Sequence, residues 1–181
     1  MRAILAASLV VLGAAQVAGE TFDLGKYGKL ELYPVGEWKI QVEDIGDLKV
    51  TFTPKTPGVN AAAQMTIAAG GVDEFPNPEK LQSQVIGVGQ RMIEAGQFVE
   101  SEPKLKKFYP KQGFGYYFVL TDPRLVGKEP VPGDFKTVTS GIIRENDKIM
   151  VRLQILSDGE TTDGFQQLAG MVEGMELTEK K

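Results

Sequence analysis

The chain has 181 residues, with 20 basic and 24 acidic side chains, a formal net charge of −4 at pH 7, and neither histidine nor cysteine. This length suits one domain, and the mild negative charge gives no general attraction for nucleic acid. The absence of cysteine excludes disulfides, thiolate metal ligands and a lipid attached through an N-terminal cysteine. The absence of histidine excludes an imidazole base, a Ser–His pair and a histidine metal ligand.

The first stretch has the form of a secretory signal peptide. Arg2 supplies one positive charge, an apolar run extends from Ala3 to about Ala15, and the next charged residue is Glu20. The run is shorter than the roughly 20 residues of a membrane-spanning helix, and small residues follow it. We predict cleavage after Gly19, with cleavage after Ala15 as the alternative. The mature chain is then expected to be soluble, without a transmembrane segment, and periplasmic or secreted.

The next part of the chain alternates in the manner of strands. EWKIQVED and DLKVTFTPK alternate apolar and polar residues on either side of a short turn, which predicts an antiparallel hairpin. KLELY is a further candidate strand. AAAQMTIAA is a strand of small residues, against which a helix can lie closely. The segment NPEKLQSQVIGVGQRMIEAG predicts a helix capped by Asn77, with Pro78 in its first turn and Gly96 at its end.

Strand patterns return from Gln97, in QFVESEP, KLKKFYP and GFGYYFVLTD, the last with two apolar faces. FKTVTSGIIRE and DKIMVRLQILSD predict a second hairpin with its turn near Glu145–Asp147. A final helix from about Thr161–Asp163 carries an apolar stripe on one side. The order of elements predicts one α+β domain at 20–178, in which helices pack against an antiparallel sheet, followed by a disordered tail at 179–181.

This layout resembles the Mog1/PsbP-like family. The resemblance rests on the tryptophan strand GEWKIQVED, its partner DLKVTFTP, the helix NPEKLQSQVIGVGQRMIEAG, the aromatic strand GYYFVL, the strand KIMVRLQILSD and a terminal helix ending in GMEL. It covers nearly the whole mature chain but rests on element order and patterning, not on an invariant motif. It implies an α/β/α sandwich and a mostly non-catalytic class of exported, lumenal or assembly-related proteins. No functional residue can be carried over from the family.

Two segments are candidate partner-binding surfaces. The first is the loop from Thr121 to Phe135, about fifteen residues long, whose three prolines would limit its freedom and favour a preformed contact. Its candidate contact residues are Asp122, Arg124, Lys128 and Glu129. The second is the turn from Lys104 to Lys111, where lysines stand beside aromatic rings and the candidates are Lys107, Tyr109 and Lys111. This turn could instead be a hairpin end whose lysines protect a sheet edge.

Other motifs favour structural roles. The acids of SDGETTDG and of GGVDEFPNPE lack the spacing of a calcium loop and suit turns and helix N-termini. GVGQRM lies inside a predicted helix, VGKEPVPG lacks the glycine and hydroxyl of a phosphate loop, and Ser140 has no histidine to activate it. We therefore assign no catalytic residue, no metal site and no cofactor.

Three functional hypotheses follow. The leading one is an exported, non-catalytic protein that binds or helps to assemble an envelope protein or complex. The alternative is a protein that binds a small apolar or anionic ligand between helix and sheet, in space left by Ala61–Ala63, Gly87 and Gly89. The third is a carboxylate-based hydrolase, which needs two acids facing each other across a cleft. The sequence identifies neither the partner nor the oligomeric state.

Overall fold

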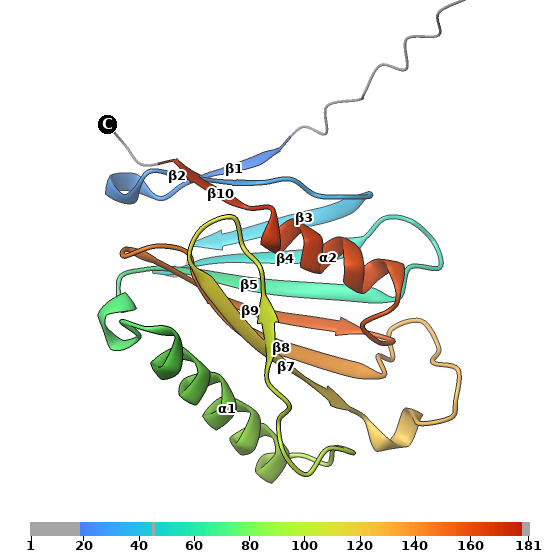
Figure 1. Ribbon diagram of the computed structural model, residues 1–181. Coiled ribbons are helices and arrows are strands. Elements are labelled where there is room, and N and C mark those ends of the chain that lie inside the picture. Colours follow the sequence, from blue (N-terminus) through green and yellow to red (C-terminus); the bar gives the residue numbers. More distant parts are fainter. Residues whose placement is uncertain (1–18, 45, 179–181) are drawn as a thin grey trace, which may run out of the picture.

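Figure 1 shows the computed structural model, which describes residues 19–44 and 46–178. The predicted signal peptide, apart from Gly19, and the predicted tail at 179–181 lie outside the described residues. The described elements in chain order are β1 Glu20–Asp23, β2 Lys29–Leu32, β3 Trp38–Asp44, β4 Leu48–Pro54, β5 Ala61–Ala69, α1 Pro78–Ala95, β6 Lys106–Phe108, β7 Phe114–Thr121, β8 Thr137–Arg144, β9 Ile149–Ser157, α2 Asp163–Glu173 and β10 Glu176–Thr178.

Seven strands form one antiparallel sheet in the order β3-β4-β5-β9-β8-β7-β6. Both predicted hairpins are present: Trp38 pairs with Pro54 at the open end of the first, and Thr137 with Ser157 at the open end of the second. The register is set by apolar residues that must share a buried face. The predicted α+β class, with helices packed on an antiparallel sheet, is therefore confirmed.

A second, three-stranded sheet lies beside the first and has the order β1-β2-β10. The KLELY strand, β2, is its centre, so it pairs with two short strands that belong to the two ends of the described chain. Leu30, Leu32 and Leu177 of this sheet are buried in the same core as α2. The expectation of a terminal helix that ends in GMEL is wrong at its end, because α2 stops at Glu173 and Glu176–Thr178 form β10. Three residues are too few for a strand periodicity to be visible in the sequence.

The two helices cover opposite faces of the large sheet (Figure 1). Along β9, Ile149 and Val151 join the core under α2, whereas the intervening Met150 joins the core under α1. This alternation is the period-2 geometry of a strand that is buried on both sides.

The predicted caps of α1 are also present. The Asn77 side chain accepts a hydrogen bond of 3.0 Å from the Lys80 amide, and the Gly96 amide donates to Met92 O at 2.9 Å.

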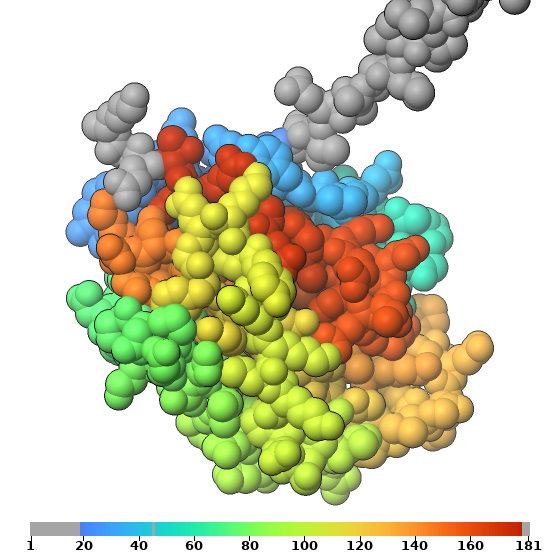
Figure 2. Space-filling model, viewed as in Figure 1, coloured from blue at the N-terminus to red at the C-terminus, as the bar shows by residue number. Residues whose placement is uncertain are grey.

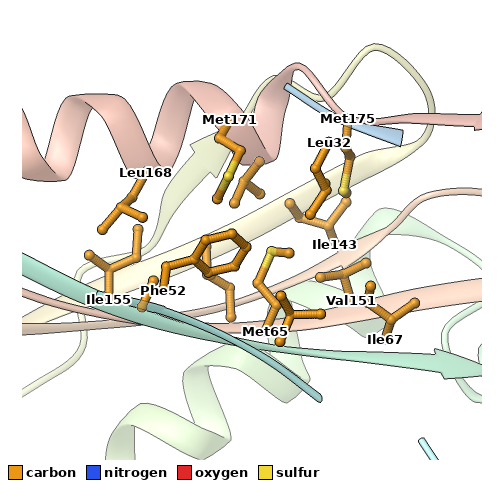
Figure 3. Packing of buried hydrophobic residues seen from close by; sticks show 14 of the residues in the cluster. Leu32, Phe52, Met65, Ile67, Ile143, Val151, Ile155, Leu168, Met171 and Met175 are labelled. Carbon is orange, nitrogen blue, oxygen red and sulfur yellow. The ribbon is translucent and has the colours of Figure 1, made fainter. Parts of the chain in front are cut away.

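The larger core lies between the sheet and α2. Figure 3 shows Phe52, Met65 and Ile155 of the sheet pointing toward Leu168 and Met171 of the helix. The predicted apolar stripe of the final helix is confirmed for Phe165, Leu168 and Val172, which are buried. Met175 is buried as well, but it follows the end of α2 at Glu173.

Small residues let α2 approach the sheet. A Cβ at Gly164 would lie 2.6 Å from the Cβ of Ala61, closer than carbon atoms can pack. The small-residue strand β5 therefore admits a helix, as its composition indicated.

The segment between α1 and β6 differs from the prediction, because it forms no strand before Lys106. Two side-chain contacts fix it in an irregular course instead. The Glu100 carboxylate accepts hydrogen bonds of 2.7 Å and 2.8 Å from the amide and hydroxyl of Thr121. Pro103 packs against Gly89 of α1, where an added Cβ would lie 2.5 Å away. In the described part of the chain, neither helix is long and apolar enough to cross a membrane.

Candidate functional site: the loop after β7

The sequence-predicted contact residues divide into two groups at opposite ends of β7. Lys107, Tyr109 and Lys111 precede this strand, and the loop that begins at Asp122 follows it. Eight residues of strand span about 26 Å at 3.3 Å per residue. The two groups therefore do not form one surface.

The loop begins with a rigid turn. Asp122 caps the short 3-10 turn Pro123–Leu125, and its carboxylate accepts the amide of Arg124 at 2.9 Å. The Arg124 side chain returns to the same carboxylate with Nη2–Oδ2 at 2.6 Å and Nε–Oδ1 at 3.0 Å. These hydrogen bonds from Arg124 hold the pKa of the Asp122 carboxyl below its ordinary value. The Asp122 carboxylate and the Arg124 guanidinium thus hold each other in one orientation, and the guanidinium stays exposed at the surface.

The far end of the loop is tied down by two residues that sequence reasoning did not assign to it, Asn60 and Asp158. The Asn60 amide donates to Asp134 O at 2.7 Å and to the Asp158 carboxylate at 3.0 Å, and its oxygen accepts the Gly133 amide at 3.3 Å. Asp158 also accepts the Lys136 amide at 3.4 Å. In the sequence, Asn60 only precedes one predicted strand and Asp158 only follows another. Their proximity becomes apparent once β5 pairs with β9 in the sheet.

A groove of about 490 Å³ lies between this loop and the end of the sheet. Its lining combines charges of both signs with apolar side chains; the lining residues include Asp122, Arg124, Lys128, Asp134 and Lys136 and the apolar Phe98, Val138 and Leu156. Figure 2 shows the loop as the gold projection at the lower right of the molecule. Glu129 lines a separate groove of about 380 Å³ with Pro130 and Pro132. The structure thus brings Asp122, Arg124 and Lys128 together and leaves Glu129 on another side of the loop.

Exposed apolar side chains accompany these charges. Val126 and Val131 on the loop are 57% and 62% exposed, and Val99 is 56% exposed. Val99 belongs to the same end of the sheet, because its amide donates to Thr121 O at 3.0 Å. Three of the six large hydrophobic residues that are exposed in the described part of the chain therefore gather at this end. We call the groove and these valines the loop surface.

The lysine-rich turn before β7 is built differently, because two of its lysines are already paired with carboxylates of the same chain. Lys106 forms an ion pair with Glu160, and Lys111 forms one with Glu176. The Lys107 ammonium lies 5.4 Å from the centre of the Tyr109 ring. These contacts favour the structural interpretation of the turn, in which lysines protect a sheet edge.

The aromatic rings beside the turn divide between core and surface. Phe108 is buried against Tyr117, with ring centres 4.4 Å apart. Burial, together with the nearby Glu160 carboxylate, raises the pKa of Tyr117 to about 12. Tyr109, the ring next to the turn, is 71% exposed, and its amide donates to the Glu173 carboxylate at 3.0 Å.

None of the small residues assigned to a ligand pocket lines the groove that the described residues form between α1 and the sheet. Ala61 and Ala63 are buried in the core under α2, and Pro103 and Phe118 occupy the space beside Gly89. A groove of about 350 Å³ does run between α1 and the sheet, but polar residues line much of it, among them Gln64, Gln84, Gln154 and Arg152. Because side chains alternate along a strand, Ala61 and Ala63 of β5 lie on the face of the sheet opposite to this groove.

The carboxylates near the clefts are mostly engaged. Glu100 is held by Thr121, and Glu160 is held by Lys106 and by the Tyr117 hydroxyl at 3.1 Å. Asp158, whose spacing does not fit a calcium loop, binds Asn60. The described residues contain no group of three or more acids, histidines or cysteines placed to hold a metal ion.

Glu145 is the exception, and the sequence pattern placed it in the turn of the second hairpin. It is 0% exposed at the end of β8, and neither carboxylate oxygen has a hydrogen-bond partner in the structure described. Burial raises its pKa to about 7.

Fold and surface define a single α+β domain that presents a braced, mixed-charge loop at one end of its sheet. No protein-family model, no curated protein and no solved structure matches this chain.

Proposed function

We propose that this chain is an exported, non-catalytic protein that binds an envelope protein or complex through the loop surface. The observation that carries the proposal is the bracing of the loop at both ends, by Asp122–Arg124 and by Asn60–Asp158. A loop already held in one conformation loses little entropy when a partner binds. Exposed valines beside an ordered guanidinium supply the apolar contact and the directed charge that protein interfaces use.

Two features of the sequence support the remaining parts of the proposal. The N-terminal stretch has the charge and hydropathy pattern of a signal peptide, and β1 begins at Glu20, directly after the expected cut. The chain also lacks histidine and cysteine, the side chains most used for acid–base and nucleophilic catalysis. The resemblance to the Mog1/PsbP-like family, whose members are mostly non-catalytic, agrees with this assignment.

The test compares the loop surface with a distant patch of the same chemistry. Protein captured from the native envelope with the wild-type chain is purified, and its affinity is measured by calorimetry for V126S/V131S and for V35S. Val35 is 55% exposed but lies between β2 and β3. We expect the double loop variant to lose about tenfold or more in affinity, since burying two valines contributes one to a few kcal/mol.

V35S should bind as the wild type does. Equal binding by the double loop variant, or an equal loss in V35S, would remove the loop from the interface.

A further inference from the structure

The two edges of the large sheet are protected to different degrees. β6 is three residues long and carries Lys106 and Lys107, and short strands with lysines resist pairing with other chains. β3, at the opposite edge, pairs with β4 over seven consecutive positions, with neither a bulge nor a proline of its own (Figure 1). A long, regular edge of this kind offers its backbone to another strand.

The hydrogen bonds of β3 identify the residues whose backbone groups point away from the molecule. The Lys55 amide donates to Glu37 O at 2.9 Å, which makes these two residues a hydrogen-bonded pair across the hairpin. Hydrogen-bonded pairs recur at every second residue of an antiparallel ladder. Trp38, Ile40, Val42 and Asp44 therefore direct their N–H and C=O groups to the open edge.

From this edge we infer that β3 pairs antiparallel with β3 of a second copy of the chain, about a two-fold axis through Gln41. In this register Lys39 lies opposite Glu43 of the second copy, Ile40 opposite Val42, and Trp38 opposite Asp44. Each relation occurs twice because the axis repeats it. The two seven-stranded sheets become one continuous sheet.

The side chains select this register over its neighbours. Residues whose backbone N–H and C=O groups point to the open edge must lie opposite one another in the paired strands. The register can therefore shift only in steps that keep Ile40 and Val42 opposite residues of this kind. A step one way places Glu37 opposite Glu43 and so sets like charges against each other. A step the other way places Ile40 opposite Asp44 and Gln41 opposite Glu43. Of these registers, only the one centred on Gln41 sets Lys39 opposite Glu43 and Ile40 opposite Val42; its one mismatched pair is Trp38 with Asp44.

The free chain shows the groups that this pairing would satisfy. Val42 is 49% exposed, although it lies on the face that packs against the core at Trp38. Glu43 already meets Lys49 of its own chain at 3.1 Å, whereas Lys39 has no ion-pair partner within 19–44 and 46–178. Pairing would cover Val42 and place the Lys39 ammonium beside Glu43 of the second copy, so that each Glu43 lies between two lysines.

The test uses two variants that repel themselves and attract each other. In a K39E dimer two carboxylates face each other at both places where Lys39 meets Glu43, and in an E43K dimer two ammonium groups face each other there. In the mixed dimer of K39E with E43K, both of these places hold a carboxylate opposite an ammonium group, because one strand is acidic at positions 39 and 43 and its partner is basic at both. We expect wild type to dimerise in sedimentation velocity at neutral pH and low salt, each variant alone to dimerise about tenfold or more weakly, and the equimolar mixture to recover the dimer. All are purified after expression of the full-length sequence.

K55E is the matched control, because it makes the same charge change on an exposed residue just after β4. It should dimerise as wild type does.

Amide exchange gives a second readout that depends on the wild type alone: the amides of Ile40 and Val42 should become protected as concentration rises, and those of Lys39 and Gln41 should not change. A monomeric wild type, a K39E dimer as stable as that of K55E, a mixture no more associated than its components, or unchanged Ile40 and Val42 amides would overturn the inference. Protection of these amides only when another protein is added would assign the edge to a different partner.

Discussion

Both carboxylate oxygens of Glu145 are buried without a hydrogen-bond partner in the part of the chain described. The neighbouring Arg144 gives no compensation, since its guanidinium donates to Pro76 O at 2.9 Å and to Asp147 at 2.6 Å. Desolvation therefore acts unopposed and raises the pKa of Glu145 to about 7. The folded chain holds this proton over a pH range in which the unfolded chain has lost it.

The consequence is a loss of stability with rising pH. Below the unfolded pKa of 4.5 the side chain is neutral in both states. Between 4.5 and about 7 the unfolded state binds fewer protons, so the free energy of unfolding falls, by up to about 3 kcal/mol. We expect E145Q, which is neutral at every pH, to be more stable than wild type by up to this amount at pH 8 and to differ little at pH 4.5.

Urea denaturation at the two pH values measures the difference. E94Q, at an exposed acid of α1, is the control and should change little at either pH. A stability gap between E145Q and wild type that does not widen with pH would show that the Glu145 carboxylate is not desolvated as described.

At the scale of the element, the packing of α2 depends on one glycine. A Cβ at Gly164 would lie 2.6 Å from Ala61 Cβ and 3.1 Å from a methyl of Val59, whereas at Gly170 of the same helix it would meet nothing within 4 Å. We expect G164A to destabilise the protein by about 1–3 kcal/mol, because the helix must move away from β5. G170A should stabilise it by up to about 1 kcal/mol through helix propensity.

Urea denaturation compares the two substitutions, which are chemically identical. A61G should recover part of the loss in the G164A background, because it removes the atom that the new methyl would meet. Equal effects of G164A and G170A would mean that α2 does not lie as close to β5 as the structure has it.

The sequence predicts these elements well where a periodic pattern is long. The two hairpins and both helices follow from alternation, apolar stripes and capping residues that act within a few positions of one another. β10 is too short to show a period. Residues 97–105 carry an apolar pattern of strand type, but Glu100 binds the end of β7 and Pro103 fills the space beside Gly89. These contacts join residues far apart in the chain, so no local pattern reports them.

The residues of the loop surface likewise divide into some that the sequence can predict and others that only the folded structure brings together. Asp122, Arg124 and Lys128 could be selected because they stand in one long, proline-containing loop. Asn60 and Asp158, which hold that loop, lie 74 and 24 residues away from Asp134, and only the pairing of β5 with β9 brings them together. The burial of Glu145 escapes prediction for a related reason, because an acid next to a turn is normally solvated.

At the scale of the whole molecule, the order of the described elements bears on how the chain is processed. β1 begins at Glu20 and pairs with β2 from Glu20↔Leu32 to Asp23↔Lys29, so a cut after Gly19 leaves the small sheet complete. A cut after Ala15 would leave the same strands with four additional residues. Within the described residues the buried core begins at Phe22, which both cuts leave in place.

We therefore expect a mature chain that begins at Glu20 when the full-length sequence is expressed in a bacterial host and the periplasm is released. Intact-mass measurement and N-terminal sequencing distinguish this chain from one that begins at Gln16. The control variant A3D/L5R breaks the apolar run at two positions outside the described residues and should keep the chain in the cytoplasm, uncut. A wild-type chain that still begins at Met1 and stays in the cytoplasm would contradict export, and with it the proposal that the loop surface meets an envelope partner. The inference about the β3 edge would stand, since it rests on the fold alone.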